Sequence, residues 1–122
     1  MRLKNFLIVV NDINRSKKFY KELFGLEVLR DFDNNVILTQ GLVLQERKSW
    51  EQAVGEPVSY GGKDTVLYFE EYDLDAFLKR IEGSGWNIHF LNPLQTLENG
   101  QKMVRLCDPD GHVIEIREME KF

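Results

Sequence analysis

A charged residue interrupts an apolar stretch near the end of the chain, in CDPDGHVIEIRE at 107–118. Glu115 stands between two isoleucines, and side chains alternate between the two faces of a strand. We therefore expect the isoleucines to pack in the core and Glu115 to point from the opposite face. A carboxylate there can bind a metal ion, contact a polar ligand or move a proton. It is costly to bury unless Arg105 or Arg117 neutralises it.

The composition is that of an ordinary globular chain. The 122 residues are 43% hydrophobic and 30% charged, and the net charge is −4. These values fit one domain and argue against nucleic acid as the main partner. The longest apolar run, 6–10, is too short to cross a membrane, and we expect no signal peptide. The single cysteine, Cys107, excludes an internal disulfide and predicts a cytoplasmic protein.

Helix and strand signals occur in the same order in both halves of the chain. A helix is expected from Asp12, a capping residue, to Gly25, and a second from Asp73 to Gly83. Apolar or alternating runs predict eight strands, at 5–10, 26–32, 35–40, 42–47, 65–70, 87–91, 102–107 and 112–118. The order is therefore βαβββ, twice.

Aligning the two halves pairs residues of similar type. Asp12 aligns with Asp73, and Gln45 aligns with Glu115. We predict an α+β fold in which two βαβββ modules form one cupped mixed sheet with the helices on its outer face.

The predicted domain spans 1–122 and contains a long connection between its modules. Module one covers about 1–47, a connecting loop covers about 48–64, and module two covers about 65–118. The loop is rich in glycine and polar residues, and loops of this length in compact domains are often functional lids.

Strand alternation predicts which side chains face the concave side of the sheet. The expected ligand-binding set is Asn5, Gln45, Arg47, Trp50, Tyr68, Glu70, Phe90, Arg105, Glu115 and Arg117. Hydrogen-bonding and charged groups over an apolar floor suit a small polar ligand. Arg47 and Arg117 can bind an anion or form salt bridges at the rim. Tyr68 and Trp50 can stack on a planar ligand or simply pack.

Two stretches carry a family resemblance. VVNDINRSKKFYKELFGLEV at 9–28 and DPDGHVIEIRE at 108–118 resemble the vicinal oxygen chelate superfamily. That superfamily includes glyoxalase I, bleomycin- and fosfomycin-resistance proteins and extradiol dioxygenases. The resemblance covers nearly the whole chain and implies the two-module fold.

The resemblance also implies where a metal ion would bind. The four family positions fall here on Asn5, Gln45, Val66 and Glu115. Only Glu115 is the expected residue, and a slip of one residue would substitute Glu46 or Thr65. Zinc, nickel and iron sites use imidazole, thiolate or carboxylate ligands. We therefore expect no metal and no other cofactor, with a divalent metal ion as the alternative.

Three functions are compatible with these residues. The first is metal-free binding of a small polar or aromatic molecule, with Glu70 and Glu115 suited to a cationic ligand. The second is a metal-dependent lyase, isomerase or dioxygenase of the glyoxalase type, in which Glu115 would be the catalytic residue. The third is a structural or regulatory module whose pocket is filled by Arg105–Glu115 and Arg117–Glu70 pairs.

We expect the chain to form a homodimer, because open sheet edges need cover and relatives in the superfamily usually dimerise. Light scattering at micromolar protein concentration should give twice the mass of one chain. A monomer under those conditions would contradict this expectation.

Overall fold

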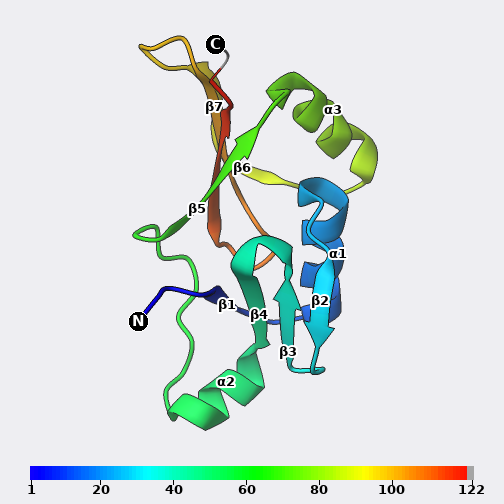
Figure 1. The fold of residues 1–122 in the computed structure, drawn as a ribbon, viewed down its shortest axis with the longest axis vertical. Coiled ribbons are helices and arrows are strands. Elements are labelled where there is room, and N and C mark those ends of the chain that lie inside the picture. Colours follow the sequence, from blue (N-terminus) through cyan, green and yellow to red (C-terminus); the bar gives the residue numbers. More distant parts are fainter. Residues whose placement is uncertain (121–122) are drawn as a thin grey trace. The chain divides into compact units, whose positions relative to one another are not determined.

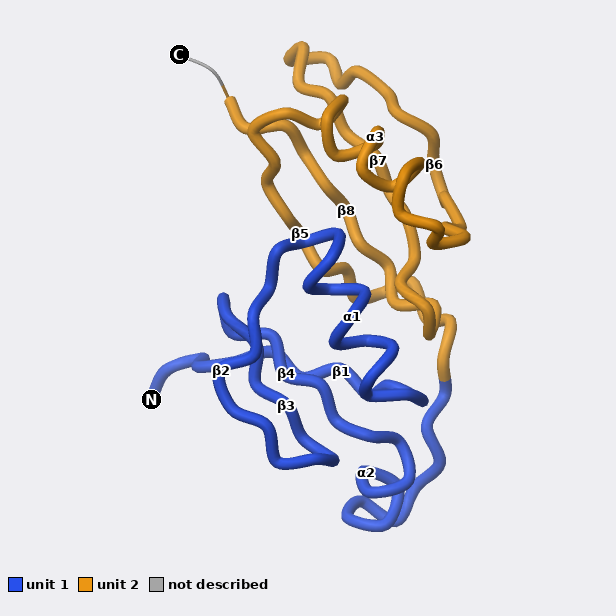
Figure 2. Tube along the Cα trace, turned by 90° about the vertical axis from the view of Figure 1, so that its right-hand side faces the viewer, with its two compact units in different colours: residues 1–59 blue, residues 60–122 orange. Residues whose placement is uncertain are grey.

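The computed structural model describes residues 1–120 and shows an α+β protein (Figure 1). Residues 121 and 122 of the predicted domain lie outside the described residues. The chain divides into two compact units, Met1–Ser59 and a second that begins at Tyr60 (Figure 2). Each unit contains the βαβββ order that the sequence predicts, and each forms a four-stranded mixed sheet of its own.

The first unit has the strand order β1-β4-β3-β2. Its elements are β1 (Phe6–Val10), α1 (Ile13–Phe24), β2 (Val28–Asp31), β3 (Asn35–Leu38), the 3-10 turn η1 (Thr39–Gly41), β4 (Leu42–Glu46) and α2 (Arg47–Val54). Strands β1 and β4 are parallel, and the other pairs are antiparallel. Phe19, Tyr20 and Leu23 of α1 are fully buried and form the core of this unit with Leu38 and Leu44 of the sheet.

The second unit has the matching strand order β5-β8-β7-β6. Its elements are β5 (Val66–Glu71), α3 (Leu74–Ser84), β6 (His89–Thr96), β7 (Lys102–Cys107) and β8 (Val113–Glu118). Strands β5 and β8 are parallel, and the other two pairs are antiparallel. The predicted strand at 87–91 begins two residues later and runs on to Thr96.

Two aspartates begin the helices as predicted. The side chain of Asp12 accepts a hydrogen bond from Arg15 N at 3.1 Å, and Asp73 accepts one from Ala76 N at 3.0 Å. Each bond satisfies a backbone N–H that has no partner within the helix. Gly25 ends α1 with a φ of 68°, a left-handed conformation that favours glycine.

The predicted end of α3 is wrong by two residues. Gly83 lies inside the helix, and Gly85 is the C-cap, with a φ of 82°. Ser84 stabilises this end, because its Oγ donates to Ile81 O at 2.7 Å and accepts from Trp86 N at 3.1 Å. The hydroxyl therefore satisfies backbone groups that would otherwise lack partners at a helix end.

The predicted connecting loop at 48–64 is wrong in its first part, because α2 occupies Arg47–Val54. Glu46 starts this helix: its carboxylate accepts from Lys48 N at 2.7 Å and from Ser49 N at 3.1 Å. A glutamate is an unusual N-cap, which is why the sequence did not reveal it. After Gly55 the chain has no helix or strand until β5.

The second sheet has one apolar face and one face that mixes charged and apolar side chains. Val104, Leu106, Ile114 and Ile116 are buried, as are Leu74, Phe77 and Ile81 of α3. Because α3 contacts β8 and alternate residues point to opposite sides, Glu115 lies on the face away from the helix. In residues 1–120 no helix is long and apolar enough to cross a membrane.

The two glycines near the end of α3 should respond oppositely to alanine. At Gly83, inside the helix, a Cβ meets nothing within 4 Å, so Gly83→Ala should stabilise the protein by about 0.5–1 kcal/mol. At Gly85 the left-handed conformation strains any Cβ, so Gly85→Ala should cost about 1–2 kcal/mol. Urea unfolding of both variants checks this, and equal effects would contradict the C-cap assignment.

Candidate functional site

Glu115 lies at the centre of a charged cluster on the second sheet. It is only 7% exposed, and in register it is opposite Tyr68 on β5 and Arg105 on β7. Arg105 Nε donates to Glu115 Oε1 at 2.7 Å, and Arg117 Nε donates to Oε2 at 2.8 Å. Each carboxylate oxygen therefore has its own guanidinium partner. We call Tyr68, Arg105, Glu115 and Arg117 the Glu115 cluster.

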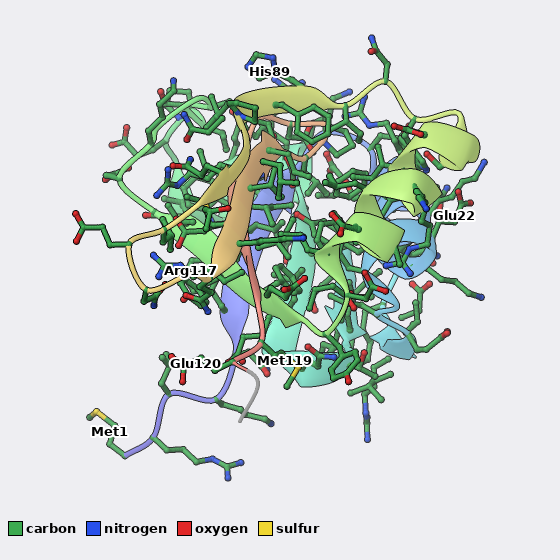
Figure 3. The ribbon with its side chains drawn as sticks, turned by 90° about the horizontal axis from the view of Figure 1, so that it is seen from above. Met1, Glu22, His89, Arg117, Met119 and Glu120 are labelled. Carbon is green, nitrogen blue, oxygen red and sulfur yellow. The ribbon has the colours of Figure 1, made fainter. Side chains whose placement is uncertain are left out.

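Further contacts hold both arginines in place. Arg105 Nη1 donates to Asn92 Oδ1 at 2.9 Å, and Arg117 Nη1 lies 3.5 Å from Gln101 Oε1. The guanidinium carbon of Arg117 is 5.3 Å from the centre of the Tyr68 ring, within the range of a cation–π contact. Figure 3 shows Arg117 on the side of the second sheet away from α3.

The arginines keep Glu115 ionised. Burial by itself raises the pKa of a carboxyl group, but the hydrogen bonds from Arg117 and Arg105 outweigh burial and leave the pKa of Glu115 lowered. The same hydrogen bond raises the pKa of Arg117. All three charges are therefore present at neutral pH.

Glu70 does not take part in the pairing that the sequence suggested. It is opposite Arg117 in register and exposed, but Arg117 pairs with Glu115 instead. Within residues 1–120 Glu70 forms no ion pair with Arg117. Of the two predicted salt bridges, the structure contains Arg105–Glu115 and replaces Arg117–Glu70 by Arg117–Glu115.

In the first unit, the amide of Gln45 is used inside its own sheet. Asn35 Nδ2 donates to Gln45 Oε1 at 2.7 Å, and Gln45 Nε2 donates to Ser49 Oγ at 2.6 Å. Asn5 precedes β1 and is half-buried beside Gly41. Gln45 therefore acts as a link between β3, β4 and α2.

Two predicted ligand contacts of the first unit belong to α2. Arg47 is the first residue of that helix and Trp50 lies in its first turn; both are half-buried. The sequence prediction had placed Arg47 at the end of a strand and Trp50 in a loop.

Phe90 lies on the other face of the second sheet from Glu115. It is opposite Leu106, whose side chain is on the α3 side. There it helps to line a largely apolar pocket of about 410 Å³, together with Leu78, Ile81, Glu82, Pro93, Leu94 and Val104. Phe90 therefore does not join the Glu115 cluster.

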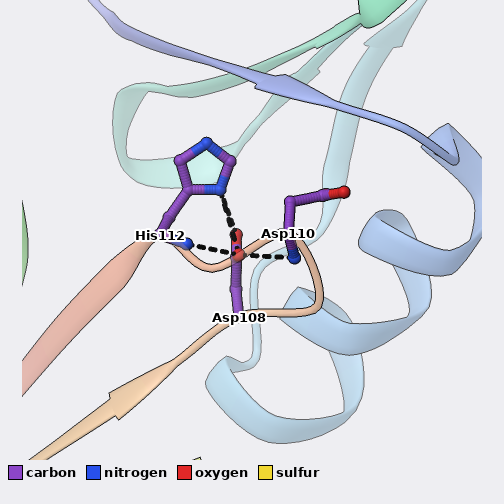
Figure 4. A group of neighbouring side chains, drawn as sticks. All are labelled: Asp108, Asp110 and His112. Atoms are coloured by element: carbon purple, nitrogen blue, oxygen red, sulfur yellow. Dashed lines mark hydrogen bonds and ion pairs between the residues drawn. The ribbon is translucent and has the colours of Figure 1, made fainter. Parts of the chain in front are cut away.

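A second group of polar side chains surrounds the turn between β7 and β8. One carboxylate oxygen each of Asp108 and Asp110 and one ring nitrogen of His112 lie within 4.8 Å of one another, which is close enough to bind one metal ion together (Figure 4). The sequence analysis did not identify this group. The signal was available as three potential ligands at alternate positions.

The hydrogen bonds of Asp108 account for this arrangement without a metal. Asp108 Oδ1 accepts from the backbone N of Asp110 and of His112, each at 2.9 Å, and Oδ2 lies 2.8 Å from His112 Nδ1. Burial lowers the pKa of His112, but its hydrogen bond to Asp108 and the nearby aspartate charges leave the pKa raised. The carboxylate therefore fixes the turn and favours a protonated imidazole, whereas a histidine that binds a metal ion must be neutral.

Cys107 precedes this turn and has the properties of an unreactive thiol. Burial raises its pKa, and the charge of Asp108 raises it further, while Lys63 lowers it slightly. A thiol with a raised pKa is a poor nucleophile.

Loss of the Glu115 charge should cost stability only where that charge is present. We expect Glu115→Gln to lower the free energy of unfolding by roughly 1.5–3 kcal/mol at pH 7. Because the folded-state pKa is lowered, this contribution is present above the ordinary glutamate value and is lost as the pH falls through the folded value. Urea unfolding of wild type and variant from pH 7 to 3 should give converging curves. A difference that stays constant with pH would contradict the pairing.

The comparisons with known proteins agree with this architecture. The profile of the Glyoxalase-like domain matches residues 3–120. Among curated proteins none matches the chain.

Among solved structures, a protein of unknown function from Agrobacterium tumefaciens str. C58 is 36% identical, with a TM-score of 0.84 over 98% of this chain and 95% of that one. A glyoxalase-related enzyme from Fulvimarina pelagi is 20% identical, with a TM-score of 0.80 over 97% and 88%. A fosfomycin resistance protein from Listeria monocytogenes is 16% identical, with a TM-score of 0.76 over 98% and 94%. The last two are similar in fold alone. The chain belongs to the Glyoxalase-like domain family, within the vicinal oxygen chelate superfamily.

Proposed function

We propose that this glyoxalase-like protein binds a small organic molecule without a metal ion, on the sheet face that carries the Glu115 cluster. The observation that supports this most directly is the state of Glu115. It is the one family metal position with an expected ligand residue, and both of its oxygens accept hydrogen bonds from arginine.

The residues present do not fit the metal that the family implies. Val66 has no donor atom, and the Gln45 amide is already bonded to Asn35 and Ser49. A cation at Glu115 would have to displace two guanidinium groups and would then be repelled by them. We therefore derive no step through a metal ion at these positions.

The cluster offers features that small-molecule sites share. An exposed aromatic ring at Tyr68 adjoins polar groups that are fixed by neighbouring side chains. Buried Met103 and Val113 lie on the same face and supply an apolar floor. A few oriented polar groups over an apolar surface are typical of ligand sites.

The competing function is a metal-dependent one, and the Asp108–Asp110–His112 group is the observation that favours it. Carboxylate and imidazole groups suit zinc, manganese or iron. For a metal to bind there, Asp108 would have to give up its ring contact with His112, and His112 would have to lose its proton.

Elemental analysis of the purified, untagged protein, followed by a thermal-shift titration with nickel, zinc, manganese and magnesium, tests the metal-free proposal. We expect no stoichiometric metal and no rise in Tm. A metal present at one hundred times its Kd would stabilise the protein by about 2.7 kcal/mol, which raises Tm by several degrees.

Two variants make a positive result interpretable. Glu115→Gln removes the carboxylate at the family position, and His112→Asn removes the imidazole at the turn. Near-stoichiometric metal that is lost in Glu115→Gln would overturn the proposal in favour of a glyoxalase-type enzyme. Metal that is lost only in His112→Asn would instead assign a cation site to the β7–β8 turn.

A further inference from the structure

We propose that the Glu115 cluster binds a small planar oxyanion, such as a carboxylate attached to an aromatic ring, through the Nη2 groups of Arg105 and Arg117. This inference rests on the proposed function, and it adds the charge and shape of the ligand. It reverses the expectation of a cationic ligand that the acidic residues suggested from the sequence.

The charges of the cluster do not balance. Two guanidinium groups face a single carboxylate, and arginine stays protonated in proteins. The side chains of Arg105 and Arg117 are 33% and 28% exposed, so both are partly shielded from water. Within the cluster one positive charge therefore has no counter-ion of its own, and the nearest carboxylate in register, Glu70, is exposed and forms no ion pair with Arg117 in residues 1–120.

In the described part of the chain, the Nη2 groups of the two arginines are the donors without a partner. In each guanidinium group, Nε is bonded to Glu115 and Nη1 faces Asn92 or Gln101. Within residues 1–120, Nη2 of Arg105 and Nη2 of Arg117 have no hydrogen-bond acceptor. These are the donors that an incoming carboxylate or phosphate oxygen can use.

The site is ordered before any ligand arrives. Glu115 fixes both guanidinium groups through Nε, and the Tyr68 ring packs against Arg117. A ligand would therefore not have to immobilise two long side chains, which is a normal cost of binding. A purely structural salt bridge needs one arginine for one carboxylate, and here the second arginine brings an additional charge.

The neighbours of the cluster indicate the shape of the ligand. Tyr68 is 57% exposed and presents a flat apolar surface beside the guanidinium groups. A ring attached to the anion can pack there.

One nearby charge opposes the binding of an anion. The carboxylate of Glu70 is opposite Arg117 in register and exposed, and its negative charge would weaken anion binding.

Isothermal titration with three matched probes tests the inference, in a buffer free of phosphate and carboxylate. Benzoate carries the ring and the anion, benzylamine carries a similar ring with a positive charge, and acetate carries the anion without the ring. We expect benzoate to bind at least tenfold more tightly than either of the other two. This comparison uses the wild-type protein, so it does not depend on the folding of any variant.

Variants then assign the binding to named side chains. Arg105→Gln and Arg117→Gln should each weaken benzoate binding at least tenfold. Arg80→Gln removes the same charge from α3, on the other side of the sheet, and should leave it unchanged within twofold. Glu70→Gln should strengthen binding, because it removes the nearby negative charge.

The failures of the two proposals can be told apart. Binding of benzylamine without benzoate would overturn the anion inference and leave metal-free ligand binding in place. No benzoate binding at millimolar concentration would also overturn the inference, as would equal loss of binding in Arg80→Gln and Arg117→Gln. Equal affinity for acetate would overturn the role assigned to the ring. A metal lost in Glu115→Gln would overturn the proposed function itself.

Discussion

The pairing of Glu115 with Arg105 and Arg117 organises the face of the second sheet that lies away from α3. A carboxylate that is 7% exposed must be neutralised, and here each oxygen accepts a hydrogen bond from a separate guanidinium group. The pairing spans two strands, because Arg105 is on β7 while Glu115 and Arg117 are on β8. It therefore links the strands through side chains as well as through their backbones.

The same pairing is the basis of the proposal that no metal ion binds at the family position. A carboxylate that serves two arginines is not available to a cation, and the Gln45 amide in the first unit is likewise used within its own sheet. Within the Glu115 cluster one more guanidinium group than carboxylate lies near the Tyr68 ring, and the exposed Glu70 is opposite Arg117 in register. The family position thus keeps its glutamate, with an arginine bonded to each of its oxygens.

The sequence predicted helix ends correctly where a single residue caps the helix. Asp12 and Asp73 could be identified as helix caps because aspartate is a preferred N-cap residue, whose short side chain accepts a hydrogen bond from a backbone N–H of the first turn. The errors arose where residues outside the local pattern intervene. Gly83 was mistaken for the end of α3, which continues to Ser84 and has Gly85 as its C-cap. The Ser84 hydroxyl donates a hydrogen bond to Ile81 O at that end. Helix α2 was missed because its cap is the less common Glu46.

The sequence by itself determined the family, the βαβββ order of each unit and the face on which Glu115 lies, because alternation and capping depend on neighbours along the chain. It did not determine the partners of Glu115, since several arginines and glutamates share that face. Strand register places Arg105 opposite Glu115 and Arg117 opposite Glu70. Arg117 nevertheless pairs with Glu115, two residues away on its own strand. Side-chain pairing across strands is a tertiary property, because it depends on which residues the register brings within about 3 Å of each other.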